Sequence, residues 1–162
     1  MADKKIPRSF LAHYIDADFG TTTPKYVRLG KHLQEFSIEL NPEVDTGSNI
    51  WGENYADVDE YKPQGSIDPY VAYEGDPLFA RLEKIINERL IGDELKTTVV
   101  DIRVNENKEV ISAYREDVTV VPKSYGGKGS VKIPFDYYYI GNRVKGDFDV
   151  GTKTFTPASL PA

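Results

Sequence analysis

Few residues of the chain have the chemistry of a catalytic or metal-binding centre. Its 162 residues include two histidines, His13 and His32, and no cysteine. Both histidines fall in strand-like stretches without the short spacing of a metal-ligand motif, so we expect them to be surface or packed residues. Thiolate metal sites and disulfides both require cysteine and are therefore excluded.

Carboxylate pairs are the next candidates, because a glycosidase uses two of them about 5 to 9.5 Å apart with one in an apolar pocket. Glu35, Ser37 and Glu39 alternate along one stretch and would share one face of a strand. That face is wholly polar and predicts no pocket, so we interpret it as a polar sheet face open to water. We predict no catalytic residue, no cofactor and no metal; a glycan hydrolase remains an alternative.

Three consecutive tyrosines, Tyr137, Tyr138 and Tyr139, offer a different chemistry. Exposed tyrosines stack on sugar rings, so a carbohydrate-binding β-sandwich is the main alternative to a structural role. Alternate residues of a strand point to opposite faces, however, and at most two of these rings can lie together. Packing in the core is the role we predict for them.

Charge argues against tight binding of nucleic acid. The formal net charge is −6, and there is no Lys or Arg between Lys31 and Lys62. Phosphate backbones need clustered basic side chains. No segment approaches the length of a membrane span and no apolar segment follows the charged start "MADKKIPRSF", so we expect a soluble protein without a membrane partner, assembled in a reducing compartment.

The elements that would position these residues are mostly strands. Period-two patterns over 100–104 and 110–122 around the turn "NENK" predict an antiparallel hairpin, with a bulge where the pattern slips near Glu116 and Asp117. Strands are also expected within 9–16, 25–30, 32–40 and 130–140, and Gly141 with Asn142 predicts a tight turn after the last.

One segment has helical spacing. In "DPLFARLEKIINERLIG", Asp76 is placed as N-cap, Pro77 at the first helical position and Gly92 as C-cap, which predicts a helix over about 77–91. We therefore expect a mainly β protein: an antiparallel β-sandwich or barrel with one flanking helix, forming a single domain over 1–162 with a flexible end at about 156–162.

A long segment between the strands has no evident place in a core. Residues of about 41–64 are rich in acids, Asn, Gly and Pro, and few apolar side chains interrupt them. Long segments of this kind are usually functional. We predict a hairpin arm that contacts another subunit, with these residues in the contact: Asp45, Ile50, Trp51, Tyr55 and Asp57.

The order of these elements resembles the tail tube proteins, or major tail proteins, of long-tailed bacteriophages, which are related in fold to the tube protein of type VI secretion. The resemblance covers nearly the whole chain. Its most similar stretches are "YVRLGKHLQEFSIELNPEVDTGSNIWGE", with a Gly-Lys turn and an acidic loop after Leu-Asn-Pro, and "DPLFARLEKIINERL", where the family has its helix.

The resemblance implies a structural virion protein and no enzyme. Six copies would form a ring whose strands join around a channel, and stacked rings would form the tail tube through which DNA is ejected. It implies contacts with further copies of the chain, with a tape measure, a tail terminator and distal tail proteins, and passage of DNA without specific binding. The place of action would be the virion tail, assembled in the host cytoplasm.

Overall fold

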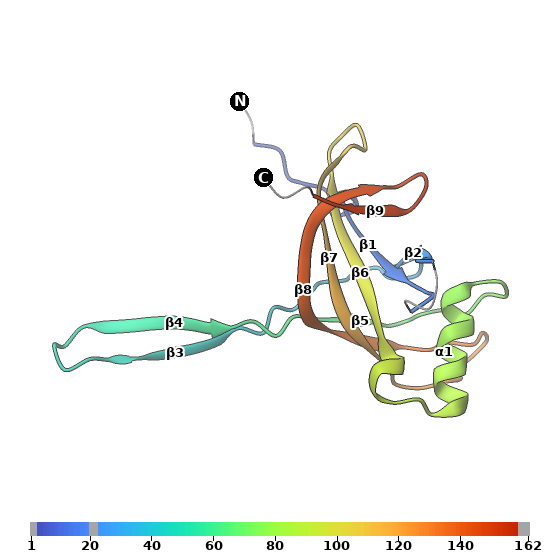
Figure 1. Ribbon diagram of the computed structural model, residues 1–162, viewed down its shortest axis with the longest axis horizontal. Helices are drawn as coiled ribbons and strands as arrows, with labels where there is room; N and C mark the ends of the chain where they lie inside the picture. The colour runs from blue at the N-terminus through green and yellow to red at the C-terminus, as the bar shows by residue number, and fades with distance from the viewer. Residues whose placement is uncertain (1–2, 20–22, 159–162) are drawn as a thin grey trace.

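The fold is mainly β, with one α-helix and two sheets (Figure 1). The computed structural model describes residues 3–19 and 23–158. In chain order the elements are β1 (Leu11–Asp16), β2 (Tyr26–Arg28), β3 (Glu43–Ser48), β4 (Asn54–Glu60), β5 (Gln64–Ile67), α1 (Pro77–Glu88), β6 (Lys96–Val104), β7 (Val110–Pro122), β8 (Phe135–Asp149) and β9 (Thr154–Pro157). Short 3₁₀ turns cover Arg8–Phe10 and Gly92–Leu95. The predicted fold class is confirmed.

The larger sheet has the order β2-β1-β6-β7-β8-β5, and β9 pairs with the second half of β8. All of its pairings are antiparallel, and the sheet curls into a half-barrel (Figure 1). Adjacent residues of β6 serve opposite faces: Val99 packs in the cluster beneath α1, whereas Val100 and Ile102 pack with Phe148 on the other side. The period-two pattern of this strand therefore supplies two separate cores.

Two bulges at the same level bend the central strands. The register of β7 with β8 shifts on both sides of Asp117, as the sequence predicted. The tight turn predicted at Gly141 and Asn142 is wrong: both residues have positive φ, but β8 continues through them. Their conformation accommodates a bulge instead, and Asn142 Nδ2 donates to Asp117 Oδ2 at 2.8 Å across it.

Helix α1 begins as predicted but ends earlier. The Asp76 side chain accepts from the Leu78 N–H at 3.0 Å, and Pro77 is the first residue. The helix ends at Glu88 because Arg89 adopts the left-handed conformation and the Leu90 N–H then bonds the Ile85 carbonyl. Gly92, predicted as the C-cap, instead opens a 3₁₀ turn.

The strand predicted within 32–40 is also wrong, because in the described part of the chain only one isolated bridge, Glu39 with Gln64, pairs this segment. Its alternation is nevertheless real: Phe36 and Ile38 are half-buried and pack against the core, while Glu39 is exposed. The predicted flexible end at 156–162 begins within β9, and its last four residues lie outside the described residues.

Candidate functional site

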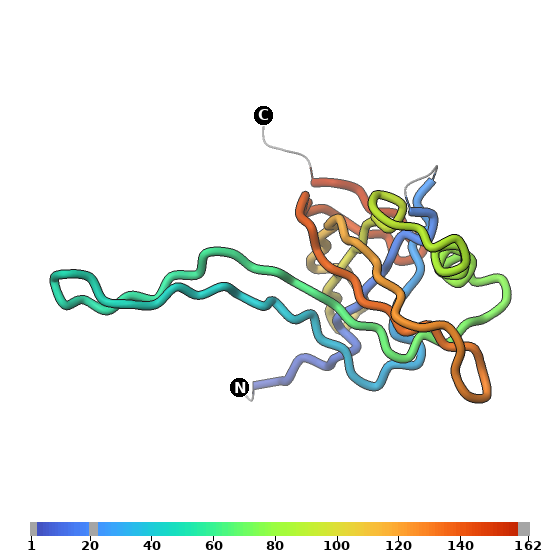
Figure 2. The backbone as a smooth tube through the Cα atoms, turned by 90° about the horizontal axis from the view of Figure 1, so that it is seen from below, coloured from blue at the N-terminus to red at the C-terminus, as the bar shows by residue number. Residues whose placement is uncertain are grey.

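The most unusual feature of the molecule is the hairpin β3–β4, which projects away from the body as a separate two-stranded sheet (Figures 1 and 2). Every residue of both strands is exposed. The six residues of β3 span about 20 Å at roughly 3.3 Å per residue. The predicted arm is therefore a real element, and a two-stranded ribbon of this kind is at best marginally stable alone in water.

The register gives the arm two chemically different faces. Opposite pairs are Val44–Val58, Thr46–Ala56 and Ser48–Asn54 on one face, and Asp45–Asp57 and Gly47–Tyr55 on the other. The first, which we call the uncharged face, has half-exposed valines at its root end. The second, the acidic face, places two carboxylates directly opposite each other, which destabilises an isolated hairpin. The facing carboxylates are therefore not explained by the stability of the arm itself.

The tip of the arm exposes large apolar side chains. Asn49 organises the turn, since its Oδ1 accepts from the Trp51 and Glu53 N–H groups at 2.9 and 3.1 Å. Gly52 has φ +80°, which closes the turn. The side chains between them are free: Ile50 is 98% exposed and Trp51 is 79% exposed. An exposed Trp at the tip of a projecting arm is typical of a residue that binds in a pocket of another molecule.

Tyr55 has a role within the arm. Its ring covers Gly47 on the opposite strand so closely that a Cβ at Gly47 would come within 2.7 Å of the Tyr55 oxygen. The same device recurs in the body, where Tyr137 covers Gly65. Aromatic rings over cross-strand glycines pin the register of a sheet. Tyr55 remains 41% exposed, so one side of its ring is still available to a partner.

The root of the arm is fastened by polar contacts. The Lys62 Nζ pairs with Glu43 and Glu60, which lie opposite each other at the start of the ribbon. These contacts hold the pKa of the Glu43 carboxyl below, and that of Lys62 above, their usual values. Asn41 Nδ2 donates to the Lys62 carbonyl at 3.1 Å. The arm therefore leaves the body in a defined direction.

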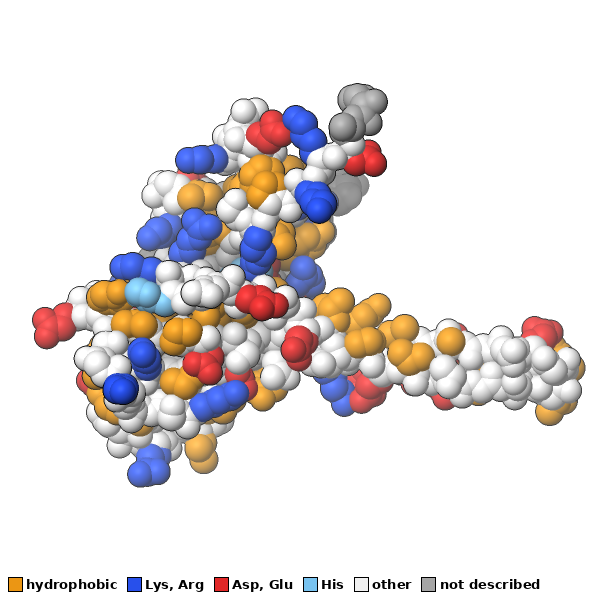
Figure 3. All heavy atoms as spheres, turned by 180° about the vertical axis from the view of Figure 1, so that it is seen from behind, with side chains coloured by type: hydrophobic (Ala, Val, Ile, Leu, Met, Phe, Trp, Pro, Cys, Tyr) orange, Lys and Arg blue, Asp and Glu red, His pale blue; other side chains and the backbone are white. Residues whose placement is uncertain are grey.

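The arm also holds the excess of acidic residues that gives the chain its negative net charge. Between residues 43 and 60 there are six acidic residues and no basic one: Glu43, Asp45, Glu53, Asp57, Asp59 and Glu60. Since the whole chain has 26 acidic and 20 basic residues, the remainder holds 20 of each. Figure 3 shows Lys and Arg side chains gathered on one face of the body, while the outer arm shows acidic and uncharged ones. The arm accounts for the net charge of −6.

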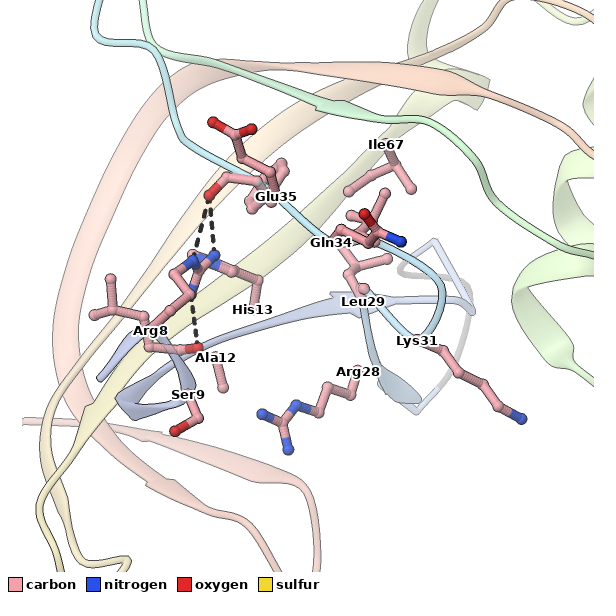
Figure 4. A pocket seen from close by; sticks show the side chains of 14 residues that line it. Arg8, Ser9, Ala12, His13, Arg28, Leu29, Lys31, Gln34, Glu35 and Ile67 are labelled. Atoms are coloured by element: carbon pink, nitrogen blue, oxygen red, sulfur yellow. Dashed lines mark hydrogen bonds between the residues drawn. The ribbon is translucent and has the colours of Figure 1, made fainter. Parts of the chain in front are cut away.

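A groove of about 650 Å³ opens in the body beside β1 and β2 (Figure 4). We call it the β2 groove. Its apolar wall includes Leu11, Leu29, Leu33 and Ile67. Arg28, Lys31 and Glu35 are exposed at its rim, and Figure 4 shows Arg28 and Lys31 pointing away from its floor. The groove thus combines an apolar part with three cations, Arg8, Arg28 and Lys31, and one carboxylate, Glu35.

At one end of the groove, Arg8 closes a chain of hydrogen bonds. Its guanidinium donates to the carbonyls of Leu11 and Phe36 and to Nε2 of His13 at 3.0 Å. His13 Nδ1 donates to Asp101 at 2.7 Å, and the Tyr139 hydroxyl donates to the other Asp101 oxygen at 2.8 Å. Burial, together with Asp101, raises the pKa of Tyr139.

This chain of hydrogen bonds resembles a catalytic relay only in composition. A general base needs a free lone pair facing substrate. With Nδ1 donating to Asp101, the one lone pair of neutral His13 lies on Nε2 and accepts from Arg8. The arrangement fastens the segment at Arg8 and the segment at Phe36 to β1 and offers no group for acid–base chemistry.

The other residues considered from sequence are placed as follows. Glu35, Ser37 and Glu39 are exposed on the unpaired segment that leads to the arm, and Glu35 reaches the groove rim. Tyr137 and Tyr139 are buried, which confirms packing as the role of these two, whereas Tyr138 is 40% exposed; the three rings therefore form no paired platform for a sugar. His32 Nε2 lies 2.6 Å from the Tyr73 hydroxyl.

Within the described residues, no group of three His, Asp or Glu side chains could hold a metal ion. None of the helices described is long and apolar enough to cross a membrane.

Comparison with known proteins identifies the fold. No family model matches the sequence, and no curated protein is similar to it. Among solved structures, the sheath/tube terminator of the extracellular contractile injection system PVC aligns with 91% of this chain and 100% of its own, at TM-score 0.56 and 8% identity. The tube-terminating cap of the anti-feeding prophage aligns with 90% and 93%, at TM-score 0.53 and 13% identity. At these identities the likeness shows a shared fold.

Sequence reasoning found the arm but missed the groove. The arm was visible because a long run of polar residues interrupts the strand pattern. The groove brings together Arg8, Arg28 and Lys31 from segments far apart in the sequence, and no local pattern connects them. The one available signal was the group of cations Lys25, Arg28 and Lys31, just before a stretch of 30 residues without any.

Proposed function

We propose that this chain is a structural component of a phage-like tail, which assembles with copies of itself into rings that stack as a tube. The observation that carries the proposal is the arm: an ordered ribbon, exposed on both faces, with an exposed Trp at its tip. Such a ribbon makes physical sense only if another molecule covers it. The fold shared with the two tube-terminating proteins supports a tail subunit as the second molecule.

The sheet supports ring formation. Within the described residues, β2 and β5 each pair with one strand, and each ends the main order of the sheet. Open edges are a liability in a monomer, but they are satisfied when each pairs with the edge of a neighbouring copy. Six half-barrels joined in this way would enclose a channel. The arm would then reach a subunit of the adjacent ring.

The channel of this tube would conduct DNA into the host without binding it. A body with 20 acidic and 20 basic residues and an acidic arm provides no excess of positive charge for phosphates. Glu35, Ser37 and Glu39 are our candidates for a polar face toward the lumen. The partners would be further copies, a tape measure, a tail terminator and distal tail proteins, in the virion tail after assembly in the host cytoplasm.

A second candidate function is tube terminator, because both structures compared above bear that description. The two functions differ in how assembly ends. A tube protein adds rings without limit, whereas a terminator stops at one ring on a tube end.

Light scattering during size-exclusion chromatography and negative-stain microscopy over a range of concentrations test the proposal. Tubes of variable length support the tube protein, and rings of one size support the terminator. A chain that stays monomeric at every concentration, also with tail-tip proteins added as initiator, contradicts both.

A further inference from the structure

We propose that the β2 groove is the receptor for the arm tip of another copy: Ile50 and Trp51 enter the groove, and acidic side chains of the arm meet Arg28 and Lys31 at its rim. This inference rests on the self-assembly proposed above and names the surface that it uses.

The groove matches the tip in size and chemistry. Pockets of about 300 to 1,000 Å³ enclose drug-sized ligands, so its volume of about 650 Å³ has room for two adjacent side chains. Part of its wall is apolar, with Leu11, Leu29, Leu33, Phe36 and Ile67, and can receive the exposed Ile50 and Trp51 side chains. An aromatic residue seated in an apolar pocket with a polar rim is the usual arrangement of an interface hot spot.

Charge complementarity favours the side of the body that carries Arg28 and Lys31. Glu53 follows the tip directly, and Asp57 lies on the acidic face behind it. On the body, neither Arg28 nor Lys31 forms an ion pair with any described residue, and the Lys31 Nζ lies over the Tyr73 ring, 4.3 Å from its centroid. Two cations at the rim therefore remain to be matched by carboxylates; Glu35 is the one carboxylate that lines the groove, and Glu74 and Asp76 line an adjoining hollow that shares both cations.

A smaller hollow of about 340 Å³ adjoins the β2 groove and shares Arg28 and Lys31 with it, but Glu74 and Asp76 also line it and would repel the acidic arm. A second groove, elsewhere on the body, fits less well too. It lies between the end of α1 and β7, has a volume of about 300 Å³, and is lined by Leu90, Val121 and Tyr125. Of its two cations, Lys123 is already paired with Asp136 at 3.0 Å, which raises the pKa of the lysine. Only Arg89 would remain for the acidic arm.

The arm and groove of one molecule cannot meet. The segment that lines the groove leads into the root of the arm, and the arm then runs outward from the body (Figures 1 and 2). A tip that fits the groove must therefore come from another copy. Such a contact joins two different surfaces and leaves a free tip and a free groove at its ends, so it propagates.

Disulfide trapping tests the contact directly, because the chain has no cysteine of its own. Ile50→Cys keeps Trp51 in place, and Gln34→Cys lies at the groove (Figure 4). Mixed under mild oxidation, these two variants should give a disulfide-linked dimer. Two matched controls should not link. Ser124→Cys, beside the second groove, should not link to Ile50→Cys. Asn107→Cys, at the tip of the β6–β7 turn, should not link to Gln34→Cys.

Charge reversal gives an independent readout. Arg28→Glu with Lys31→Glu, and Glu53→Lys with Asp57→Lys, should each raise the concentration needed for assembly at least about tenfold. Combining all four changes should restore assembly, while circular dichroism shows that every variant is folded.

The outcomes separate this inference from the proposed function. Tubes or rings from the unmodified chain, with Ile50→Cys linking to Ser124→Cys or to neither position, overturn the groove and leave self-assembly standing. An unmodified chain that never assembles overturns the proposed function and this inference with it.

Discussion

Two hairpins of the chain have the same turn, but one belongs to the body and the other projects from it. In β3–β4, Asn49 bonds the N–H of Trp51 and Glu53; in β6–β7, Asn105 bonds the N–H of Asn107 and Glu109 in the same way. The residue that closes the turn has positive φ in both, as Gly52 and Lys108. The turn therefore does not decide whether a hairpin belongs to the body.

The difference lies in the strands and in what the tips carry. Residues of β6 alternate between two cores, whereas no residue of β3 or β4 is buried. The tip of β6–β7 carries the polar pair Glu106 and Asn107, and the tip of the arm carries Ile50 and Trp51 in the equivalent positions. One hairpin stabilises the fold and exposes a polar tip; the other contributes no core and exposes an apolar one.

The largest effect we expect comes from removing the arm. Replacing Asp45–Asp57 by a short Gly-Ser linker should leave the body folded, because both hydrophobic clusters lie outside the arm. It should abolish assembly completely. Circular dichroism reports the fold and electron microscopy the assembly. An unfolded variant would show that the arm supports the core, and normal tubes would show that it serves another purpose.

Single core substitutions should separate the hairpins by stability. Ile102→Ala removes a buried side chain of β6 and should lower the free energy of unfolding by about 2 to 5 kcal/mol. Val44→Ala in β3 should change it by less than about 0.5 kcal/mol, because that side chain is half exposed. Urea denaturation of the monomer measures both. Equal losses would contradict the division between body and arm.

Substitutions at the two tips should separate them by assembly. Trp51→Ala should weaken each contact by about 2 kcal/mol, the usual loss for an interface Trp, and leave the stability of the monomer unchanged. Asn107→Ala, in the equivalent position of the other turn, is the control and should leave assembly unchanged. The measurement is the concentration at which half of the protein assembles. A Trp51→Ala variant that assembles normally would remove the tip from the interface.

Salt should discriminate between the apolar and the charged part of the contact. If the acidic arm meets basic side chains, assembly should weaken several-fold between about 0.05 and 0.5 M NaCl, because exposed charges are screened beyond about 10 Å at 0.1 M. Turbidity or sedimentation follows the assembled fraction. The Trp51→Ala variant should keep the same salt slope, and assembly indifferent to salt would leave only apolar and backbone contacts.

The two hairpins also differ in how local sequence patterns predict them. The β6–β7 hairpin, its bulge and the start of α1 follow from local patterns, namely alternation, a phase slip and the Asp76-Pro77 cap. The arm follows from the absence of such a pattern. The turn predicted at Gly141 and Asn142 was wrong, because residues with positive φ occur in bulges as well as in turns. Only the pairing of β8 with β7 shows that these two residues form a bulge.

The lack of strand pairing along the segment 32–40 could not be predicted from its local sequence pattern either. Its apolar and polar residues alternate as in a half-buried strand. A strand also needs a paired neighbour along its length, and here only Glu39 forms a bridge, with Gln64. The groove depends on tertiary structure entirely, because Arg8 reaches Phe36 across 28 residues and the rim cations come from β2 and the residues after it.

The smallest effect concerns the facing carboxylates of the arm. Asp45→Asn removes one of two like charges that lie directly opposite each other, so the hairpin itself should open about two- to fivefold less often. Amide hydrogen exchange of the monomer would show this as slower exchange in β3 and β4. Glu53→Gln is the control, because it makes the same change of charge beside the turn without an acidic partner opposite. If the acidic face meets basic side chains in the assembly, Asp45→Asn should stabilise the free arm and weaken assembly at the same time. A variant in which both the arm and the assembly become more stable would mean that the two carboxylates face water in the tube.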